Sequence, residues 1–99
     1  MTAPGETFPE AGQIAVRGRL TVETVPVLFE TGLRHLESGN LRVDFSGVEG
    51  VDSAAISMLL GWQRAAQRNR RDVRVAGWPD DLRSLARLYG VDDLLPLAR

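Results

Sequence analysis

The sequence predicts an α/β domain, in which a mixed sheet is joined and covered by helices. Segments with apolar residues at alternate positions recur along the chain, as expected for strands. Segments with apolar residues at helical spacing lie between them. Because crossover helices are what join parallel strands, this alternating order favours a sheet with helices laid on it.

The chain divides into a loose start and one domain. Residues 1–12 are rich in Gly, Pro and Glu, which indicates a loose N-terminal segment with a possible edge strand at Glu6 to Phe8. Residues 13–99 form a single domain, because 99 residues suffice for one core only. Its first segment, "QIAVRGRL", alternates as a strand, in which Gly18 predicts a bulge or bend.

The remaining elements follow in order. From Thr21, which can cap, "VETVPVLFETGLRHLESG" predicts a helix with Pro26 in its first turn. "LRVDF" predicts a short strand, "SGVEG" a polar turn, and residues 53–68 a second helix that ends in the basic tract "RNRR". "DVRVAGW" then predicts a strand, "PDDLRSLARLYG" a short helix with Pro79 at its start and Gly90 at its stop, and "VDDLLPLAR" a last turn.

Composition argues against several classes of function. With 43% apolar and 25% charged residues the chain reads as a folded globule, and a net charge of -1 offers no general attraction for nucleic acid. There is no cysteine for a disulfide or thiolate metal site. The N-terminus lacks a signal-peptide pattern, and the longest apolar run, Ala54 to Trp62, is too short to span a bilayer. We therefore expect a cytosolic protein without direct membrane insertion.

The second helix carries both a core face and a row of small residues. Ile56, Leu59 and Leu60 fall on one face, where burial of each contributes roughly 1.5–3 kcal/mol to folding. The row runs along the helix from its N-terminus and comprises Ser53, Ser57, Gly61 and Arg64. One interpretation is that Asp52 or Ser53 only caps the helix. The other is a docking site, in which a phosphate on Ser53 would meet a favourable helix dipole but repulsion from Asp52.

A longer stretch around Ser53 resembles a known family. "VDFSGVEGVDSAAISMLLGW" is similar to the central signature of STAS domains, the fold of anti-sigma factor antagonists, and "GRLT" resembles the turn before that family's first helix. The matching segments cover about residues 13–95. The resemblance implies the STAS fold, a mixed sheet of about four strands with about four helices packed mainly on one face. The ending "LARLYGVDDLLP" is similar to the MlaB-like branch, which serves the Mla phospholipid transporter.

Two functions follow from this resemblance. The MlaB-like branch implies a non-catalytic subunit that binds and regulates or stabilises the ATPase (MlaF-like) of a phospholipid ABC transporter. The permease and substrate-binding subunits belong to the same complex, which maintains outer-membrane lipid asymmetry. Such a protein lies on the cytoplasmic face of the inner membrane, held there by its partner. The transporter subunit is the favoured function, and the alternative, implied by the sigma-factor branch, is an anti-sigma factor antagonist switched by phosphorylation of Ser53.

The resemblance also assigns the site. Ser53 occupies the phosphorylated position of the sigma-factor branch, but Ala54 and Ala55 replace that branch's Ser-Gly, which favours contact over phosphorylation. The expected partner-binding residues are Asp52, Ser53, Ala54, Ser57, Gly61 and Arg64.

Other chemistry finds little support in the sequence. No phosphate-binding Gly-x-x-x-x-Gly-Lys loop is present, and His35 is the only histidine, so we expect no catalytic residues, cofactor or metal. Structural roles are expected for Asp80-Asp81 and Asp92-Asp93 instead of acid–base chemistry, and the first pair sits where a helix N-terminus favours negative charge. "RNRR" could touch anionic lipid, but a basic helix C-terminus and turn explain it without a membrane, and this explanation is favoured. Trp62 is expected in the core, with an aromatic anchor in a partner interface as the alternative.

Overall fold

The computed structural model describes residues 6–10 and 12–95. Residues 1–5 and 11 of the expected loose segment, and residues 96–99 of the expected domain, lie outside the described residues. The elements are β1 (Glu6–Glu10), β2 (Gln13–Leu20), α1 (Val25–Ser38), β3 (Leu41–Val51), α2 (Ser53–Asn69), β4 (Val73–Ala76), α3 (Asp80–Leu88) and the 3-10 turn η1 (Asp92–Leu94).

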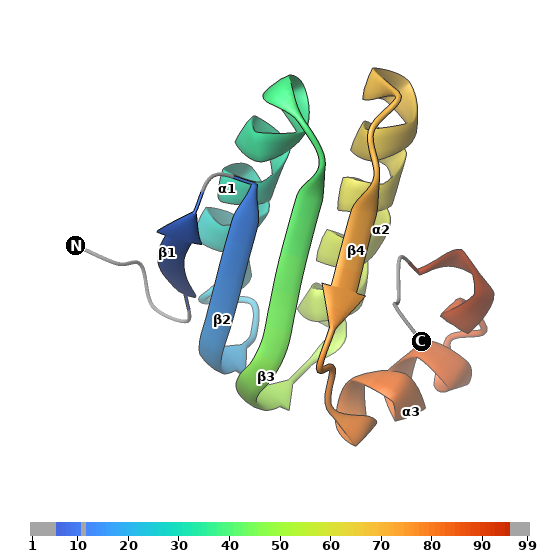
Figure 1. The fold of residues 1–99 in the computed structure, drawn as a ribbon. Helices are drawn as coiled ribbons and strands as arrows, with labels where there is room; N and C mark the ends of the chain where they lie inside the picture. The colour runs from blue at the N-terminus through green and yellow to red at the C-terminus, as the bar shows by residue number, and fades with distance from the viewer. Residues whose placement is uncertain (1–5, 11, 96–99) are drawn as a thin grey trace.

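The sheet has the strand order β1-β2-β3-β4 and is mixed. Strands β2, β3 and β4 are parallel, whereas β1 lies antiparallel to β2 at one edge. Helices α1 and α2 lie side by side on one face of the sheet, and α3 lies near the end where β3 finishes (Figure 1). The predicted α/β class is confirmed.

The expected number of about four helices is wrong for the described part of the chain, which holds three α-helices. The segment after Gly90 forms only the single 3-10 turn of η1, because Leu95 is already extended (φ -86°, ψ 148°). Gly90 itself has a φ of +69°, which ends α3 in the left-handed conformation that glycine favours.

Strand β3 is much longer than predicted. "SGVEG" continues the strand to Val51 instead of forming a turn. Two register shifts against β2 place extra residues on β3, one between Asp44 and Gly47 and one between Val48 and Gly50. Such bulges accommodate a polar, glycine-rich stretch within a paired strand. On β2, Gly18 sits at the second shift with a φ of +83°, which confirms the predicted bend.

Helix α1 begins later than predicted. Residues 21–24 form a turn, so Thr21 does not cap the helix, and Pro26 lies in the first helical turn as expected. The Thr24 hydroxyl donates to the carbonyl of Arg19 at 2.7 Å and accepts the N–H of Thr21 at 3.0 Å. These bonds close the turn before the helix and leave Val22 at its exposed tip, 68% accessible.

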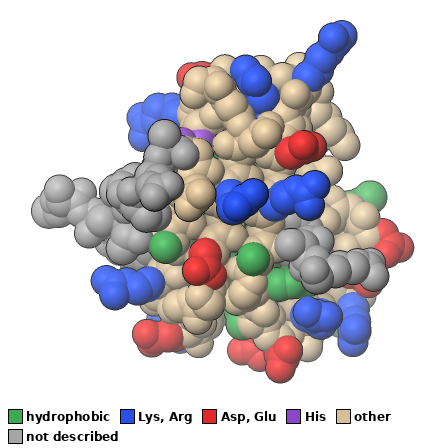
Figure 2. All heavy atoms as spheres, viewed as in Figure 1, with side chains coloured by type: hydrophobic (Ala, Val, Ile, Leu, Met, Phe, Trp, Pro, Cys, Tyr) green, Lys and Arg blue, Asp and Glu red, His purple; other side chains and the backbone are tan. Residues whose placement is uncertain are grey.

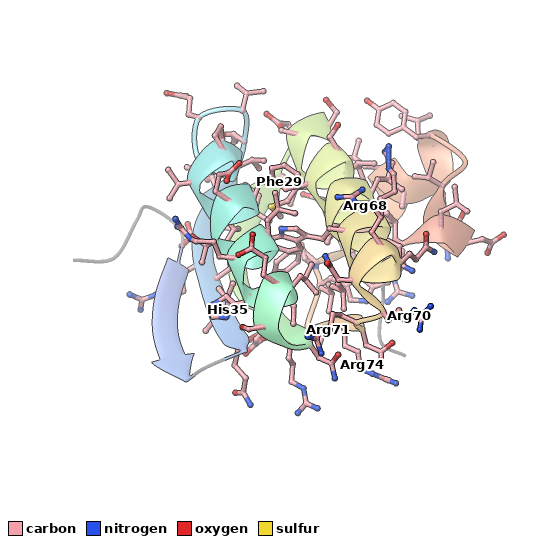
Figure 3. All side chains as sticks on the ribbon, turned by 90° about the horizontal axis from the view of Figure 1, so that it is seen from above. Phe29, His35, Arg68, Arg70, Arg71 and Arg74 are labelled. Atoms are coloured by element: carbon pink, nitrogen blue, oxygen red, sulfur yellow. The ribbon has the colours of Figure 1, made fainter. Side chains whose placement is uncertain are left out.

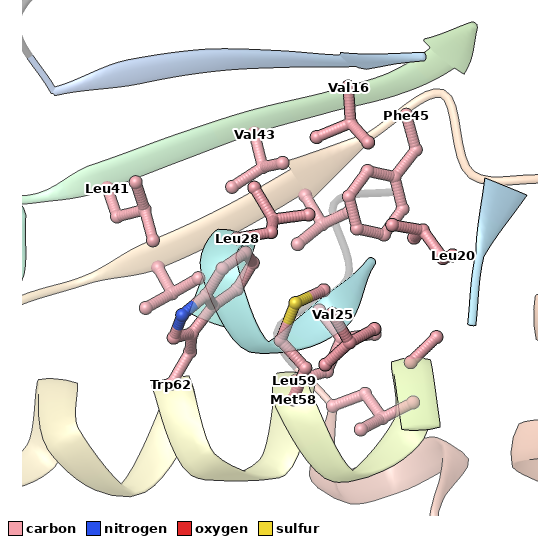
Figure 4. Close-up of a cluster of buried hydrophobic side chains, with 14 of the residues drawn as sticks. Val16, Leu20, Val25, Leu28, Leu41, Val43, Phe45, Met58, Leu59 and Trp62 are labelled. Carbon is pink, nitrogen blue, oxygen red and sulfur yellow. The ribbon is translucent and has the colours of Figure 1, made fainter. Parts of the chain in front are cut away.

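The core lies between the inner face of the sheet and helices α1 and α2 (Figure 4). Ile56 and Leu59 are buried as predicted, and Leu60 is partly buried against the same cluster. Trp62 is fully buried, which confirms its expected place in the core, and its Nε1–H donates to the carbonyl of Phe29 at 3.0 Å. A side chain at Gly32 would clash with its indole ring, so glycine lets α1 pack directly on Trp62.

Candidate functional site

The candidate site is the N-terminal end of α2, where β3 passes into the helix at Asp52. The Asp52 N–H donates to the carbonyl of Leu20 at 3.0 Å, which fixes the junction to the end of β2. One carboxylate oxygen of Asp52 accepts the N–H of Ala54 at 2.8 Å, so Asp52 is the helix cap. The other oxygen accepts the N–H of Val22 at 3.3 Å. Both oxygens of Asp52 therefore have structural partners within this chain.

Ser53 is the first residue of α2 and differs from Asp52 in being exposed. Within the described residues its hydroxyl makes no hydrogen bond, because the capping role belongs to Asp52. An exposed hydroxyl at a helix start stands beside backbone N–H groups and the positive end of the helix dipole. Ser53 is thus available for contact or modification, while its neighbour is not.

The residues of the predicted row on α2 differ in their surroundings. Ser57 and Arg64 are exposed, as a contact surface requires, whereas Ala54 is partly buried against the core. A Cβ at Gly61 would lie 2.6 Å from the Phe29 ring, so this glycine serves the close approach of α1 inside the domain. Gly61 has an internal neighbour for its small size, and partner contact by the row stays a prediction.

The structure also has an apolar hollow between Val51, at the end of β3, and helix α3, which the sequence alone does not predict. It has a volume of about 340 Å³ and is lined by Val51, Asp81, Ser84, Leu85 and Leu88. Leu88 is 75% exposed and Val22, on the loop tied to Asp52, is 68% exposed. The signal for Leu88 was available, because helical spacing turns it away from Leu82 and Ala86, the buried residues of α3. The place of Val51 was not predicted, because "SGVEG" before it was interpreted as a turn, whereas β3 continues to Val51.

The open face of the sheet carries a second member of the signature stretch. Asp44 accepts hydrogen bonds from the hydroxyl and the backbone N–H of Ser46, at 2.7 and 2.9 Å. These bonds, the hydroxyl first, hold the pKa of the Asp44 carboxyl below its usual value, while partial desolvation opposes them. Gly77 closes over the pair, because a Cβ there would lie 2.9 Å from an Asp44 oxygen.

The remaining candidates do not gather into a reactive centre. His35 accepts the N–H of Gly12 through Nδ1 at 3.3 Å and is partly buried. Asp80 and Asp81 lie in the first turn of α3, and Asp92 and Asp93 in η1. Over residues 6–10 and 12–95, no three acidic or histidine side chains come together as a metal site. In the same ranges, no helix has the length and apolar character needed to cross a membrane.

Comparison with known proteins places this fold. The family model described as "Mlab, STAS domain" matches residues 6–96. The chain belongs to the STAS domain family. This STAS domain is 28% identical over 85 residues to the anti-sigma-B factor antagonist of Staphylococcus aureus strain NCTC 8325 / PS 47, with 84% of this chain and 79% of the relative covered. The antagonist of strain COL gives the same values.

A solved structure gives the same fold. The anti-sigma factor antagonist SpoIIAA in its unphosphorylated form superposes with a TM-score of 0.64 at 13% identity, covering 95% of this chain and 86% of SpoIIAA. At that identity the likeness establishes the fold, and the predicted STAS fold is confirmed. The exposed Ser53 of this STAS domain lies directly after its capping Asp52.

Proposed function

We propose that this STAS domain is a regulator of the anti-sigma factor antagonist type, which works by binding a protein partner through the N-terminal end of α2. The observation that carries the proposal is the division of labour between Asp52 and Ser53. Asp52 caps the helix with both oxygens engaged, and Ser53 presents an exposed hydroxyl that has no hydrogen-bond partner among the described residues. The similarity to anti-sigma factor antagonists supports this choice of partner class.

Phosphorylation of Ser53 is the switch in this proposal. A phosphate adds about 1.5 to 2 negative charges, and it would stand next to the Asp52 carboxylate. Repulsion between the phosphate and the Asp52 carboxylate opposes the hydrogen bond that Asp52 accepts from Val22, so the loop before α1 loosens. The phosphate itself also covers the docking surface. The partner is then expected to leave. Because the chain acts by binding, no catalytic residue is assigned to it, and the proposed location is the cytoplasm.

Incubation of the purified chain with ATP and a cognate anti-sigma kinase tests this function. Mass spectrometry should find one phosphate, on Ser53, and the Ser53→Ala variant should accept none. Ser57→Ala is the matched control, because Ser57 is the next exposed serine on the same helix, and it should be phosphorylated like the wild type. Absence of phosphate on the wild-type chain would count against the switch.

A second candidate is the MlaB-like role. Its support is the description of the matching family model together with the similar ending "LARLYGVDDLLP". In that role the same helix end binds the ATPase of a phospholipid ABC transporter, and the chain is peripheral to the inner membrane. The ending supplies three exposed apolar side chains, Leu88, Tyr89 and Leu94, for such a contact.

Identification of the bound partner separates the two roles. The tagged chain is purified from membrane and soluble fractions of its native cells, and the proteins that come with it are identified. A kinase-like anti-sigma factor in the soluble fraction supports the antagonist. An ABC ATPase together with its permease in the membrane fraction supports the MlaB-like role instead.

A further inference from the structure

Arginine side chains gather at the opposite end of the molecule from Ser53. Arg70, Arg71 and Arg74 lie in one neighbourhood where α2 ends and β4 begins (Figure 3). On the open face of the sheet, basic side chains stand in the middle and at the edge away from the start of α2, while acidic and basic side chains both occur along the edge where α2 starts (Figure 2). The chain therefore concentrates positive charge at one end, despite its net charge of -1.

Two of these arginines are neighbours on adjacent strands. Arg42 of β3 and Arg74 of β4 are in direct register. Both are exposed and alternate with the buried residues of their strands, so both side chains stand on the open face. Adjacent strands lie only about 4.8 Å apart, and like charges placed opposite each other destabilise a sheet. Among the described residues, neither guanidinium makes an ion pair or a hydrogen bond.

Arg70 adopts a backbone conformation that is unfavourable for a residue with a side chain. It ends α2 in the left-handed conformation with a φ of 56°, the only residue other than glycine with positive φ in the described ranges. Glycine or asparagine is the usual occupant of that position. The helix dipole favours cations at the C-terminal end of α2 and so accounts for the charge of Arg68 and Arg70. It does not account for Arg42 and Arg74, which belong to strands.

The paired arginines line a small polar hollow. Its volume is about 230 Å³, and it is lined by Gly12, Gln13, Asn40, Leu41, Arg42, Asp72 and Arg74. The backbone of Asp72 makes two hydrogen bonds that fix the base of the hollow. Its N–H donates to the Asn40 side-chain oxygen and its carbonyl accepts the N–H of Leu41, both at 2.9 Å. Among the described lining residues, Asp72 is the only acidic side chain, so Arg42 and Arg74 leave the lining with a net positive charge.

We propose that this hollow binds a phosphate group. Guanidinium groups bind phosphate through paired N–H donors, and two in register can clamp one phosphate from two sides. The volume is below the roughly 300–1,000 Å³ of pockets for drug-sized ligands, which favours a phosphate or a phosphomonoester over a whole nucleotide. The described residues that line the hollow include no aromatic side chain, so they offer no stacking surface of the kind that single-stranded nucleic acid uses. This site is independent of the function assigned to Ser53.

Titration with inorganic phosphate at constant ionic strength tests the proposal. Amide and arginine side-chain NMR signals of Arg42 and Arg74 should shift saturably with phosphate and not with chloride. Arg42→Gln and Arg74→Gln should each raise the dissociation constant by about fivefold or more, in line with loss of a charge-assisted bond. Asp72→Asn should lower it, because this change removes the opposing charge and leaves the backbone bonds of Asp72 in place. Arg87→Gln, the same charge change on exposed α3, should have no effect.

Vesicles distinguish the two sources of a phosphate group. Phosphatidylcholine vesicles with and without phosphatidic acid are sedimented with the chain. Binding that requires phosphatidic acid and is lost in Arg42→Gln and Arg74→Gln supports a lipid headgroup as the source. Saturable phosphate binding without vesicle binding supports a soluble phosphate. Shifts that do not saturate, that chloride reproduces, or that Arg42→Gln and Arg74→Gln leave unchanged would overturn the proposal.

Discussion

Asp52 holds Val22 beside the start of α2, because the carboxylate that caps the helix also accepts the Val22 N–H at 3.3 Å. Residues separated by 30 positions in sequence are thereby joined at the candidate site. The bond connects the loop before α1 to the first turn of α2. The Val22 backbone is thus held at the cap of α2, and its side chain is exposed.

Replacement of Asp52 by alanine should therefore destabilise the domain. Loss of the cap costs about 1 kcal/mol, with a range of roughly 0.5–2 kcal/mol, and loss of the Val22 bond adds to it. Chemical denaturation monitored by circular dichroism would measure the change. Asp52→Asn, which keeps an oxygen for the Ala54 N–H, should lose much less. Equal stability of the alanine variant and the wild type would mean that the cap contributes nothing.

Gly32 and Trp62 give a second stability prediction. A Cβ at Gly32 would meet the fully buried indole ring, so Gly32→Ala must displace either α1 or Trp62. We expect a loss of about 1–3 kcal/mol, the usual cost of overpacking a core. Gly39→Ala is the matched control, because nothing lies within 4 Å of a Cβ there and its backbone is extended. If both variants unfold at the same denaturant concentration, the conclusion that Gly32 is needed for α1 to pack against Trp62 is wrong.

The Asp44–Ser46 pair predicts a pH dependence. The Ser46 hydroxyl and N–H lower the pKa of the folded-state Asp44 carboxyl, so the pair stabilises the fold above the unfolded pKa of about 3.9. That contribution is lost as the pH falls through the lowered folded pKa. Ser46→Ala should raise the pKa of Asp44, as read from its carboxyl carbon signal in an NMR titration. The stability difference between this variant and the wild type should be present at pH 7 and shrink below about pH 4. An unchanged Asp44 titration would contradict the assignment.

The hollow between Val51 and α3 predicts a separation of binding from stability. Leu88 is 75% exposed, so Leu88→Ala should leave the unfolding midpoint nearly unchanged. If the partner fills the hollow, the same variant should weaken its binding by about fivefold or more. Leu82→Ala on the same helix should behave in the opposite way, because Leu82 is fully buried and its truncation costs about 2–5 kcal/mol. Wild-type affinity in Leu88→Ala would remove the hollow from the interface.

Local signals made α2 predictable. The Asp52 cap and the spacing of Ile56 and Leu59 are encoded within one segment, and the helix ends at Asn69, one residue beyond the predicted Arg68. The end of β3 was not predictable in the same way. "SGVEG" resembles a turn in isolation, and it is held extended by pairing with β2, whose residues lie about thirty positions earlier.

The same distinction applies to the site. Asp52 and Ser53 could be singled out because cap, hydroxyl and family signature are adjacent in sequence. Helical spacing marks Leu88 as exposed, but the sequence alone does not predict that Leu88 shares a hollow with Val51 or that Val22 bonds to Asp52, because each pairing joins elements far apart in the chain. Gly61 was assigned to a partner surface because a small residue on a helix permits close approach. The helix that approaches Gly61 is α1 of the same domain, and only tertiary packing decides this.

Affinity of the purified chain for its identified partner, measured by calorimetry for wild type and Ser53→Arg, tests the central claim most directly. Gln67→Arg, an exposed residue near the other end of α2, provides the same added charge as a control. We predict that Ser53→Arg weakens binding by about tenfold or more, as expected for the centre of an interface, while Gln67→Arg keeps wild-type affinity. The thermal unfolding temperature of Ser53→Arg should fall only slightly, because a cation at a helix N-terminus costs about 0.3–1 kcal/mol. Wild-type affinity in Ser53→Arg would contradict the assignment of the partner site to the N-terminal end of α2.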